Sequence, residues 1–212
     1  RWDAGQQYAT RVLLRLAAAD QQQVKYEVPD TFIATWRSIL HNLPENKFFA
    51  AQLLSLPALH TIIAQLDNVA IDSLTRAYDQ LAQVLATSLS REFLQCYYAH
   101  HDPDPSYNMH NVGRRKLKNL ALRYLMTISD QGLHHDLGMQ QFVSSVAVNM
   151  TDTLAALAAL SHLDSELRGR AFAQFYDTWR NNDLVMDKWL SLQAAAHLPG
   201  TCAQVKHLLE HP

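Results

Sequence analysis

Glycine and cysteine are scarce in this sequence. The 212 residues include six glycines, all of them isolated, and two cysteines, Cys96 and Cys202. The scattered glycines exclude a glycine-rich phosphate-binding loop. Two cysteines are too few for a disulfide framework, and their spacing fits no zinc ribbon. We therefore expect a reducing, cytoplasmic location, with both cysteines buried in helical stretches.

Long apolar runs and a strong net charge are also missing. The longest apolar stretches, such as residues 154–160, fall well short of the roughly 20 residues of a membrane span, and the first residues contain no apolar signal-peptide segment. The net charge of -2 predicts no general attraction to nucleic acid or to acidic membranes. Because helical spacing is present at the first residues and again at the last, we expect a piece of a longer protein.

The composition is that of a globular, helix-rich protein. Hydrophobic residues make up 48% of the chain and charged residues 18%, which is not the composition of a disordered chain. Alanine and leucine are abundant, and together with the low glycine content they favour helices. The length suffices for one sizeable core, so we expect a single helical domain over residues 1–212.

Hydrophobic residues recur at helical spacing along nearly the whole chain. Residues 24–28 alternate and are the only strand candidate. The clearest helix is expected over residues 70–98, where apolar residues line one side of about seven turns. In the first half of the chain, the other expected helices are an opening one around residues 13–16, one after Pro29 with Asp30 as its N-cap, one after Pro44, and one with Pro57 in its first turn. In the second half, they are one over residues 113–128, a shorter one near residues 139–146, one with Asn149 as its N-cap, one over residues 167–179, and one over residues 185–196.

These elements predict an all-α fold of about ten helices. The short connections between them predict an antiparallel helical array. The array is either a bundle or a solenoid-like superhelical stack of the HEAT or armadillo type. No segment of fixed length repeats along the sequence, so self-similarity selects no named repeat family.

The sequence contains eleven histidines, so metal binding has to be considered. Neighbouring histidines on a helix point about 100° apart, which is a poor arrangement for holding one ion. The motif H-E-x-x-H, which places two imidazoles on one helical face, is absent. We interpret both histidine clusters as solvated loop residues and expect no metal-binding residue. The clusters are His134, His135 and Asp136, and His100 and His101 with Asp102 and Asp104.

Five basic residues fall within one predicted helix. We expect Arg115, Lys116 and Lys118 near its exposed side, opposite Leu117 and Leu120. No aromatic residues are interleaved with them for base stacking. A solvated face is therefore favoured over a nucleic-acid groove, which stays the alternative. The basic residues are Arg114, Arg115, Lys116, Lys118 and Arg123.

The remaining candidate sites have structural interpretations. No G-x-S-x-G motif is present. Asn149-Met150-Thr151 matches an N-glycosylation sequon, but helix capping explains Asn149 better because no secretory signal is visible. The tryptophans are expected in the core, since each falls on the apolar stripe of its helix. No catalytic or cofactor-binding residue is expected. The tryptophans are Trp2, Trp36, Trp179 and Trp189.

Residues 181–196, NNDLVMDKWLSLQAAA, resemble the segment W-x-x-N-x-L-V-M-D-K-W-x-x-x-Q-A of bacterial-type aminopeptidase N, with Trp179 two residues ahead of them. Further stretches resemble the last domain of these enzymes in the same order, so the similarity covers nearly the whole chain. They are RWDA at residues 1–4, LPALHTIIAQLDNVAIDSLTRAYDQLAQVLATSL at residues 56–89, GRRKLKNLALRYL at residues 113–125, and NMTDTLAALAAL at residues 149–160.

The resemblance implies a role as well as a fold. These enzymes are zinc metallopeptidases of the gluzincin family that remove N-terminal residues from peptides. Their catalytic domain carries an H-E-x-x-H zinc motif and a G-x-M-E-N segment, and neither occurs here. The resemblance implies a helical domain that closes over the catalytic domain and limits substrate access. This chain would correspond to about its first two thirds.

The implied partners are the catalytic and other N-terminal domains of the same polypeptide and the peptide substrates in the enclosed cavity, with no nucleic acid and no membrane. Zinc would belong to the parent's catalytic domain, and the family's substrate-facing arginines would lie beyond Pro212. A free-standing helical module that binds peptides or proteins stays an alternative. Trp189 and Val185 are expected to hold their helix against the one that ends at Trp179, with Asp187 and Lys188 facing outward.

Overall fold

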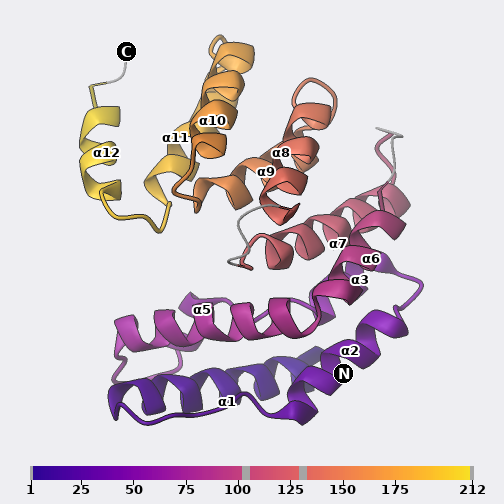
Figure 1. The fold of residues 1–212 in the computed structure, drawn as a ribbon, viewed down its shortest axis with the longest axis vertical. Coiled ribbons are helices and arrows are strands. Elements are labelled where there is room, and N and C mark those ends of the chain that lie inside the picture. Colours follow the sequence, from indigo (N-terminus) through magenta and orange to yellow (C-terminus); the bar gives the residue numbers. More distant parts are fainter. Residues whose placement is uncertain (1, 102–105, 129–132, 211–212) are drawn as a thin grey trace. The chain divides into compact units, whose positions relative to one another are not determined.

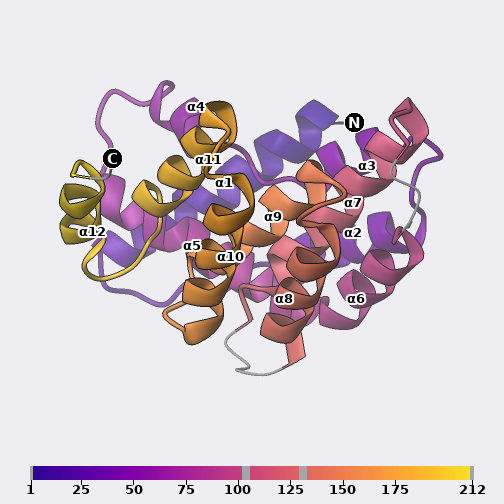
Figure 2. The same ribbon diagram turned by 90° about the horizontal axis from the view of Figure 1, so that it is seen from above.

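The computed structural model describes residues 2–101, 106–128 and 133–210 (Figures 1 and 2). Within these ranges there are helices, turns and loops but no strand, which confirms the all-α prediction. Twelve helices are present in the described residues, against the expected ten or so. They are α1 (Trp2–Gln21), α2 (Asp30–His41), α3 (Lys47–Leu53), α4 (Leu59–Ile63), α5 (Ile71–Ser88), α6 (Ser90–Ala99), α7 (Met109–Leu125), α8 (Leu133–Ser145), α9 (Met150–Ser161), α10 (Glu166–Trp179), α11 (Asp183–Ala194) and α12 (Thr201–Leu208).

The helices pack into two compact units. Unit 1 holds α1 to α7, and unit 2 holds α8 to α12. In unit 1, α1 packs along α5, while α7 packs against α3, α5 and α6. In unit 2, α8 packs against α9, and α10 contacts α8, α9 and α11. Of the described helices, none combines the length and the apolar character needed to cross a membrane.

Unit 1 has an aromatic core centred on Tyr124 of α7. The ring of Tyr124 stacks on Phe93 of α6, with centroids 4.7 Å apart, and meets Trp36 of α2 edge to face at 5.6 Å. The Tyr124 hydroxyl donates a hydrogen bond to the carbonyl of Leu54, which follows α3, over 3.3 Å. All four residues are buried. The core of unit 1 is therefore assembled from four segments that meet at one side chain of α7.

Gly113 allows α7 to approach α3 closely. A Cβ atom at this position would lie 2.9 Å from the backbone nitrogen of Phe48, closer than real Cβ contacts occur. Glycine inside a helix lowers helix stability by roughly 1 kcal/mol relative to alanine. The close packing of the two backbones explains its presence here. One turn further along, the Lys116 ammonium lies 3.6 Å from the centroid of the Phe48 ring.

In unit 2, the start of α9 is secured by Asn149. Its side-chain oxygen accepts hydrogen bonds from the backbone N–H groups of Thr151 (3.0 Å) and Asp152 (3.4 Å), so the predicted N-cap is confirmed. The side-chain amide of Gln141 on α8 donates to the Asp152 carbonyl over 3.0 Å. The first turn of α9 is thereby bonded both to its cap and to its neighbouring helix.

The predicted single helix over residues 70–98 is wrong. Helix α5 ends at Ser88 and α6 begins at Ser90, while Leu89 between them has φ -125° and ψ 21°, outside helical geometry. Serine is a weak helix former because its hydroxyl competes for backbone hydrogen bonds. Arg37 of α2 donates to the Ser88 carbonyl over 3.0 Å and so satisfies one of the carbonyls that a helix end leaves unpaired. The apolar stripe continues through the break because Leu89 is fully buried.

The beginnings of two helices also differ from the predictions. The N-cap of α2 is Pro29, with φ -60° and ψ 134°, and Asp30 is the first helical residue. Pro29 already has the extended backbone of a cap, so the helix begins directly after it. Pro57 does not lie in the first turn of α4, because the N-cap of that helix is Ala58. Residues 24–28 form no strand: they are an extended connection without a ladder partner in the described part of unit 1.

Helices α7 and α8 are longer at their starts than predicted. Helix α7 begins at Met109 because the Asn108 side chain accepts a hydrogen bond from the Asn111 N–H over 2.8 Å, and it ends at Leu125, three residues before the predicted end. Helix α8 begins at Leu133, although the sequence pattern indicated a start near residue 139. Polar first turns lack the apolar periodicity on which the prediction was based.

Candidate functional site

Unit 1 contains a groove with a volume of about 570 Å³ between α1, α5 and the connection from α1 to α2. Its α5 wall consists of Arg76, Gln80 and Val84, which are four residues apart and therefore share one side of the helix. The facing wall is the extended connection, residues 23–28. The residues that α1 contributes are Leu16, Ala19 and Asp20.

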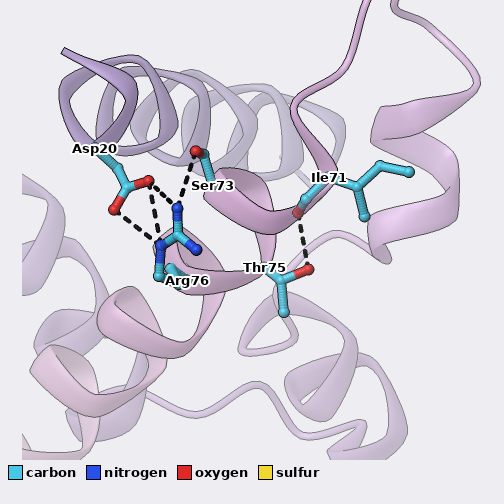
Figure 3. Close-up of polar contacts among 5 residues, drawn as sticks. All are labelled: Asp20, Ile71, Ser73, Thr75 and Arg76. Atoms are coloured by element: carbon cyan, nitrogen blue, oxygen red, sulfur yellow. Dashed lines mark hydrogen bonds and ion pairs between the residues drawn. The ribbon is translucent and has the colours of Figure 1, made fainter.

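An ion pair between Asp20 and Arg76 joins the two helices at one end of the groove (Figure 3). The Arg76 Nε atom donates to both carboxylate oxygens, over 3.1 and 3.3 Å, and Nη2 donates to Oδ2 over 2.7 Å. Nη2 also lies 3.3 Å from the Ser73 hydroxyl oxygen, one turn earlier on α5. Near the start of α5, the Thr75 hydroxyl donates to the Ile71 carbonyl over 2.9 Å.

Hydrogen bonding to the Arg76 guanidinium, and secondarily to Ser73, lowers the pKa of Asp20 to about 2. The same pair raises the pKa of Arg76. The Asp20 side chain is 30% exposed and that of Arg76 61% exposed. The pair therefore remains charged at neutral pH and accessible to a ligand, while salt partly screens it.

The Asp20–Arg76 pair makes the stability of unit 1 depend on acidity. The folded pKa of Asp20 lies below its unfolded value of about 3.9, so the pair stabilises the fold fully above that value and loses its effect as pH falls from about 4 toward 2. Asp20→Asn should lower the melting temperature at neutral pH. The difference in melting temperature between the variant and the original protein should shrink below about pH 4. Thermal unfolding followed across this pH range tests the expectation. A difference that stays constant down to about pH 2 would contradict it.

A second ion pair lies on the outer wall of the groove. Lys25 Nζ is 2.6 Å from Glu27, and the two side chains are 84% and 76% exposed. Hydrogen bonding within this pair raises the pKa of Lys25 and lowers the pKa of Glu27. The groove thus presents both signs of charge, but no serine, cysteine or histidine occurs among its lining residues. Its charged and polar groups are suited to binding a polar ligand.

The first histidine cluster assembles no metal site. His134 and His135 lie in α8 and are half-buried, so the prediction of loop residues is wrong for them. Asp136, the third member, is exposed on the same helix. In the part of the chain that the structure describes, no group of three or more histidine, cysteine, aspartate or glutamate residues could hold a metal ion.

In the second cluster, His100 is buried and follows the last residue of α6, while His101 is exposed. The Nδ1 atom of His100 lies 2.8 Å from the Cys96 carbonyl oxygen. Burial lowers the pKa of His100 and favours the neutral imidazole. The predicted solvated histidine is therefore wrong at His100. Asp102 and Asp104, the other members of this cluster, lie outside the described residues.

The basic residues of α7 do not form the predicted solvated face. Arg115 and Lys118 are buried, with exposed fractions of 5% and 2%. Arg115 donates to the Ser106 carbonyl over 3.3 Å, and the Lys118 ammonium lies 6.0 Å from the ring centroid of Tyr97. Because α7 has neighbours on several sides, the positions opposite its apolar stripe are covered as well. The helix therefore lacks the continuous exposed basic surface that a nucleic-acid groove requires.

The tryptophans occupy three kinds of environment. Trp36 and Trp189 are buried, as predicted. Trp179 is half-buried and donates its indole N–H to the Val146 carbonyl over 3.1 Å. Trp2 is 45% exposed, so the core prediction is wrong there. Trp2 is the first residue of α1.

Helix α11 is held against α10 largely through Trp189. The indole N–H donates to the Phe172 carbonyl over 3.0 Å, and the Tyr176 ring centroid lies 5.2 Å from that of Trp189. Asp187 and Lys188 are exposed, as predicted. Val185 is only half-buried, whereas Trp189 is buried.

The two cysteines differ in exposure. Cys96 is buried in α6, and burial raises its pKa to about 12, so the thiol stays protonated and unreactive. Cys202 is exposed on α12, which contradicts the prediction that both are buried. Neither cysteine lies among the residues that line the groove.

The Asp20–Arg76 pair and the groove beside it were not predicted. The two residues are 56 positions apart, and each resembles an ordinary exposed residue of an amphipathic helix. Arg76, Gln80 and Val84 recur every four residues and therefore lie on one side of α5. Charged, polar and apolar residues on the same side of a helix could have indicated a side that is only partly buried.

A comparison with protein families matches residues 1–212 to the family described as "Domain of unknown function (DUF3458_C) ARM repeats". The description confirms the predicted armadillo-like class of fold. Each repeat of such a protein contacts mainly its neighbours along the chain. The match covers the whole chain, although no repeat of fixed length is apparent in the sequence.

The chain is also similar to curated bacterial enzymes. It is 30% identical over 211 residues to aminopeptidase N of Escherichia coli (strain K12), and 27% identical over 212 residues to aminopeptidase N of Haemophilus influenzae (strain ATCC 51907 / DSM 11121 / KW20 / Rd). Each match covers 100% of this chain and 24% of the relative. The chain therefore spans about a quarter of the length of these relatives.

Among solved structures, the fold is similar to that of Legionella pneumophila aminopeptidase A, crystallised in complex with aspartic acid. The TM-score is 0.84 and the sequence identity is 26%, over 100% of this chain and 25% of that chain. Together with the matches to aminopeptidase N, this similarity confirms the predicted resemblance to the C-terminal helical domain of bacterial-type aminopeptidase N.

Proposed function

The chain belongs to the DUF3458_C family of ARM-repeat domains, and from this premise we propose that it is part of the C-terminal capping domain of a zinc-dependent aminopeptidase. In that enzyme it helps to enclose the active-site cavity and limits which peptides enter. One observation carries the proposal: the whole chain matches about a quarter of enzymes called aminopeptidase N. The partners are then the catalytic and other N-terminal domains of the same polypeptide, together with peptide substrates.

The residues of this chain support a role without catalysis. The sequence contains no H-E-x-x-H motif, and the described residues do not fit a zinc site, since no three ligand residues come together among them. The zinc of the parent enzyme would be bound by its catalytic domain. The contribution of this part would be to exclude water from the cavity and restrict its entrance. The two free thiols suit a parent enzyme of the reducing cytoplasm. The proposal includes no nucleic-acid partner and no membrane partner.

The size and activity of the native protein test the proposal. An antibody raised against this chain should detect, in the source cells, a polypeptide several times heavier than 24.1 kDa. The purified 212-residue chain should fold but release no amino acid from alanine p-nitroanilide in the presence of zinc, whereas the long polypeptide should do so. A native band near 24.1 kDa would instead support a free-standing helical module. Zinc-dependent turnover by the short chain alone would overturn the assignment of catalysis to other domains.

A further inference from the structure

We propose that His162 is a pH-dependent latch in unit 2. Its neutral side chain holds the connection between α11 and α12 at the end of α9, and its protonation releases that connection. This property belongs to the chain itself, goes beyond the capping role proposed above and does not depend on it. Three observations carry the inference: the direction of one hydrogen bond, the closeness of two histidine rings, and the weak packing of α12.

The hydrogen bond at the end of α9 requires a neutral imidazole. His162 is the C-cap residue of α9, and its Nδ1 atom accepts from the backbone N–H of His197 over 3.3 Å. A backbone N–H only donates, so Nδ1 carries a lone pair and the ring proton lies on Nε2. In the imidazolium form both ring nitrogens carry protons. Protonation of His162 therefore replaces the acceptor by a donor and breaks this bond.

The two histidine rings also contact each other. The rings of His162 and His197 meet edge to face, with centroids 5.2 Å apart. Both side chains are exposed, so they exchange protons with the solvent directly. When both rings are charged, like charges at this separation repel each other. Acidification therefore removes a hydrogen bond and adds a repulsion at the same place.

The segment that follows His197 has few other attachments to unit 2. Helix α12 contains no buried residue and packs mainly on α11. The Thr201 hydroxyl at its start donates to the carbonyls of Ala196 and Leu198, over 2.8 and 2.9 Å, so these bonds join α12 to the connection itself. Segments with little buried surface open at a small cost in free energy. We therefore expect α12 to loosen when the connection is released.

The charges around His162 set the pH of release but not its direction. On α10, the Arg168 Nε atom donates to the Ser161 carbonyl over 3.1 Å, next to His162, and this cation disfavours a second positive charge. On α11, no charged residue follows Lys188. The other charged or titratable side chains of the neighbouring segments are His134, His135 and Asp136 at the start of α8, Asp164 before α10, Glu166 and Arg170 on α10, and Lys206 and His207 on α12. The direction is fixed because an imidazolium offers the His197 N–H no acceptor.

Nuclear magnetic resonance of the 212-residue chain tests the latch. Histidine side chains titrate between about pH 5 and pH 8, so the bond should be present above this range and lost as pH falls through it. The His197 amide signal should shift with the same midpoint as the His162 ring signals. Protection factors, which already correct for the effect of pH on intrinsic exchange, should fall about twofold to tenfold in α12, the range for one hydrogen bond. Protection in α12 that stays constant while His162 becomes protonated would overturn the proposal.

Matched variants separate the hydrogen bond from other effects of pH. His162→Asn has an amide oxygen in place of Nδ1 and does not titrate, so protection in α12 should change less than about 1.5-fold over the same pH range. His162→Phe keeps a ring but has no acceptor, so protection should be low at both ends of the range. His197→Ala retains the donating N–H and should keep the pH dependence. Circular dichroism establishes that each variant is folded.

The variants also state what would contradict the latch. If His162→Asn or His162→Phe loses protection with falling pH as the original chain does, another group is responsible and the proposal is wrong. This result would leave the capping role untouched, because it concerns neither the size nor the activity of the parent enzyme.

Discussion

Replacing Tyr124 by alanine should lower the free energy of unfolding of unit 1 by about 3–5 kcal/mol, the range found for buried aromatic side chains. Tyr124 is 2% exposed and contacts Phe93 and Trp36 through its ring. Its removal takes away apolar burial and leaves a cavity that side chains from three helices cannot all refill. Urea unfolding followed by circular dichroism measures the loss, and hydrogen exchange should show reduced protection in α6 and α7.

Two control variants separate the parts of this effect. Tyr124→Phe keeps the ring and removes the hydroxyl with its 3.3 Å hydrogen bond to the Leu54 carbonyl, so about 0.5–1.5 kcal/mol should be lost. Tyr107→Ala truncates a tyrosine that is 88% exposed and should change stability by less than about 0.5 kcal/mol. A loss below about 1 kcal/mol for Tyr124→Ala would contradict the central place of this residue in the core.

The burial of Tyr124 follows from sequence periodicity, whereas the burial of two cations on the same helix does not. The spacing of Leu117, Leu120 and Tyr124 identifies one apolar stripe, and all three are buried. A periodicity argument places the opposite side in solvent, where Arg115 and Lys118 were expected. In the structure α7 packs against α3, α5 and α6, so burial extends around the helix. The number of neighbours that a helix acquires is a tertiary property that its own sequence does not contain.

The start of α9 was predictable because its capping side chain makes local hydrogen bonds. Asn149 caps α9 through contacts two and three residues away, and this short-range geometry is visible in the sequence. At the break at Leu89, by contrast, the Ser88 carbonyl accepts a hydrogen bond from Arg37 of another helix, 51 residues earlier in the chain. The apolar stripe crosses the break without interruption, so the spacing of apolar residues does not mark it. The serines on both sides of Leu89 are the local signal that the periodicity argument did not use.

The candidate groove was beyond prediction for the same reason. Its walls come from two separate helices and a connection whose alternating residues 24–28 suggested a strand. The alternation does reflect an extended backbone, but no partner strand lies beside it among the described residues. A sequence pattern can thus indicate the conformation of a segment correctly while leaving its partner undetermined.

In unit 2, Trp189→Ala should lower the free energy of unfolding by about 3–5 kcal/mol. Trp189 is 9% exposed, donates its indole N–H to the Phe172 carbonyl over 3.0 Å, and lies against the Tyr176 ring. Domain stabilities are commonly about 5–15 kcal/mol, so a loss of this size is a large part of the total. Truncation also removes the hydrogen bond and the ring contact that Trp189 makes with α10. Hydrogen exchange should therefore show the first loss of protection in these two helices.

The corresponding controls distinguish anchoring from a general effect of changing α11. Leu184→Ala alters an apolar residue of the same helix that is 78% exposed, and it should change stability by less than about 0.5 kcal/mol. Trp189→Phe retains most of the buried aromatic surface but loses the indole hydrogen bond and some volume, so its effect should fall between those of the other two variants. If Trp189→Ala were no more harmful than Leu184→Ala, α11 would have to be held by other contacts. Gln193, the other buried residue of α11, is the first candidate for such a contact.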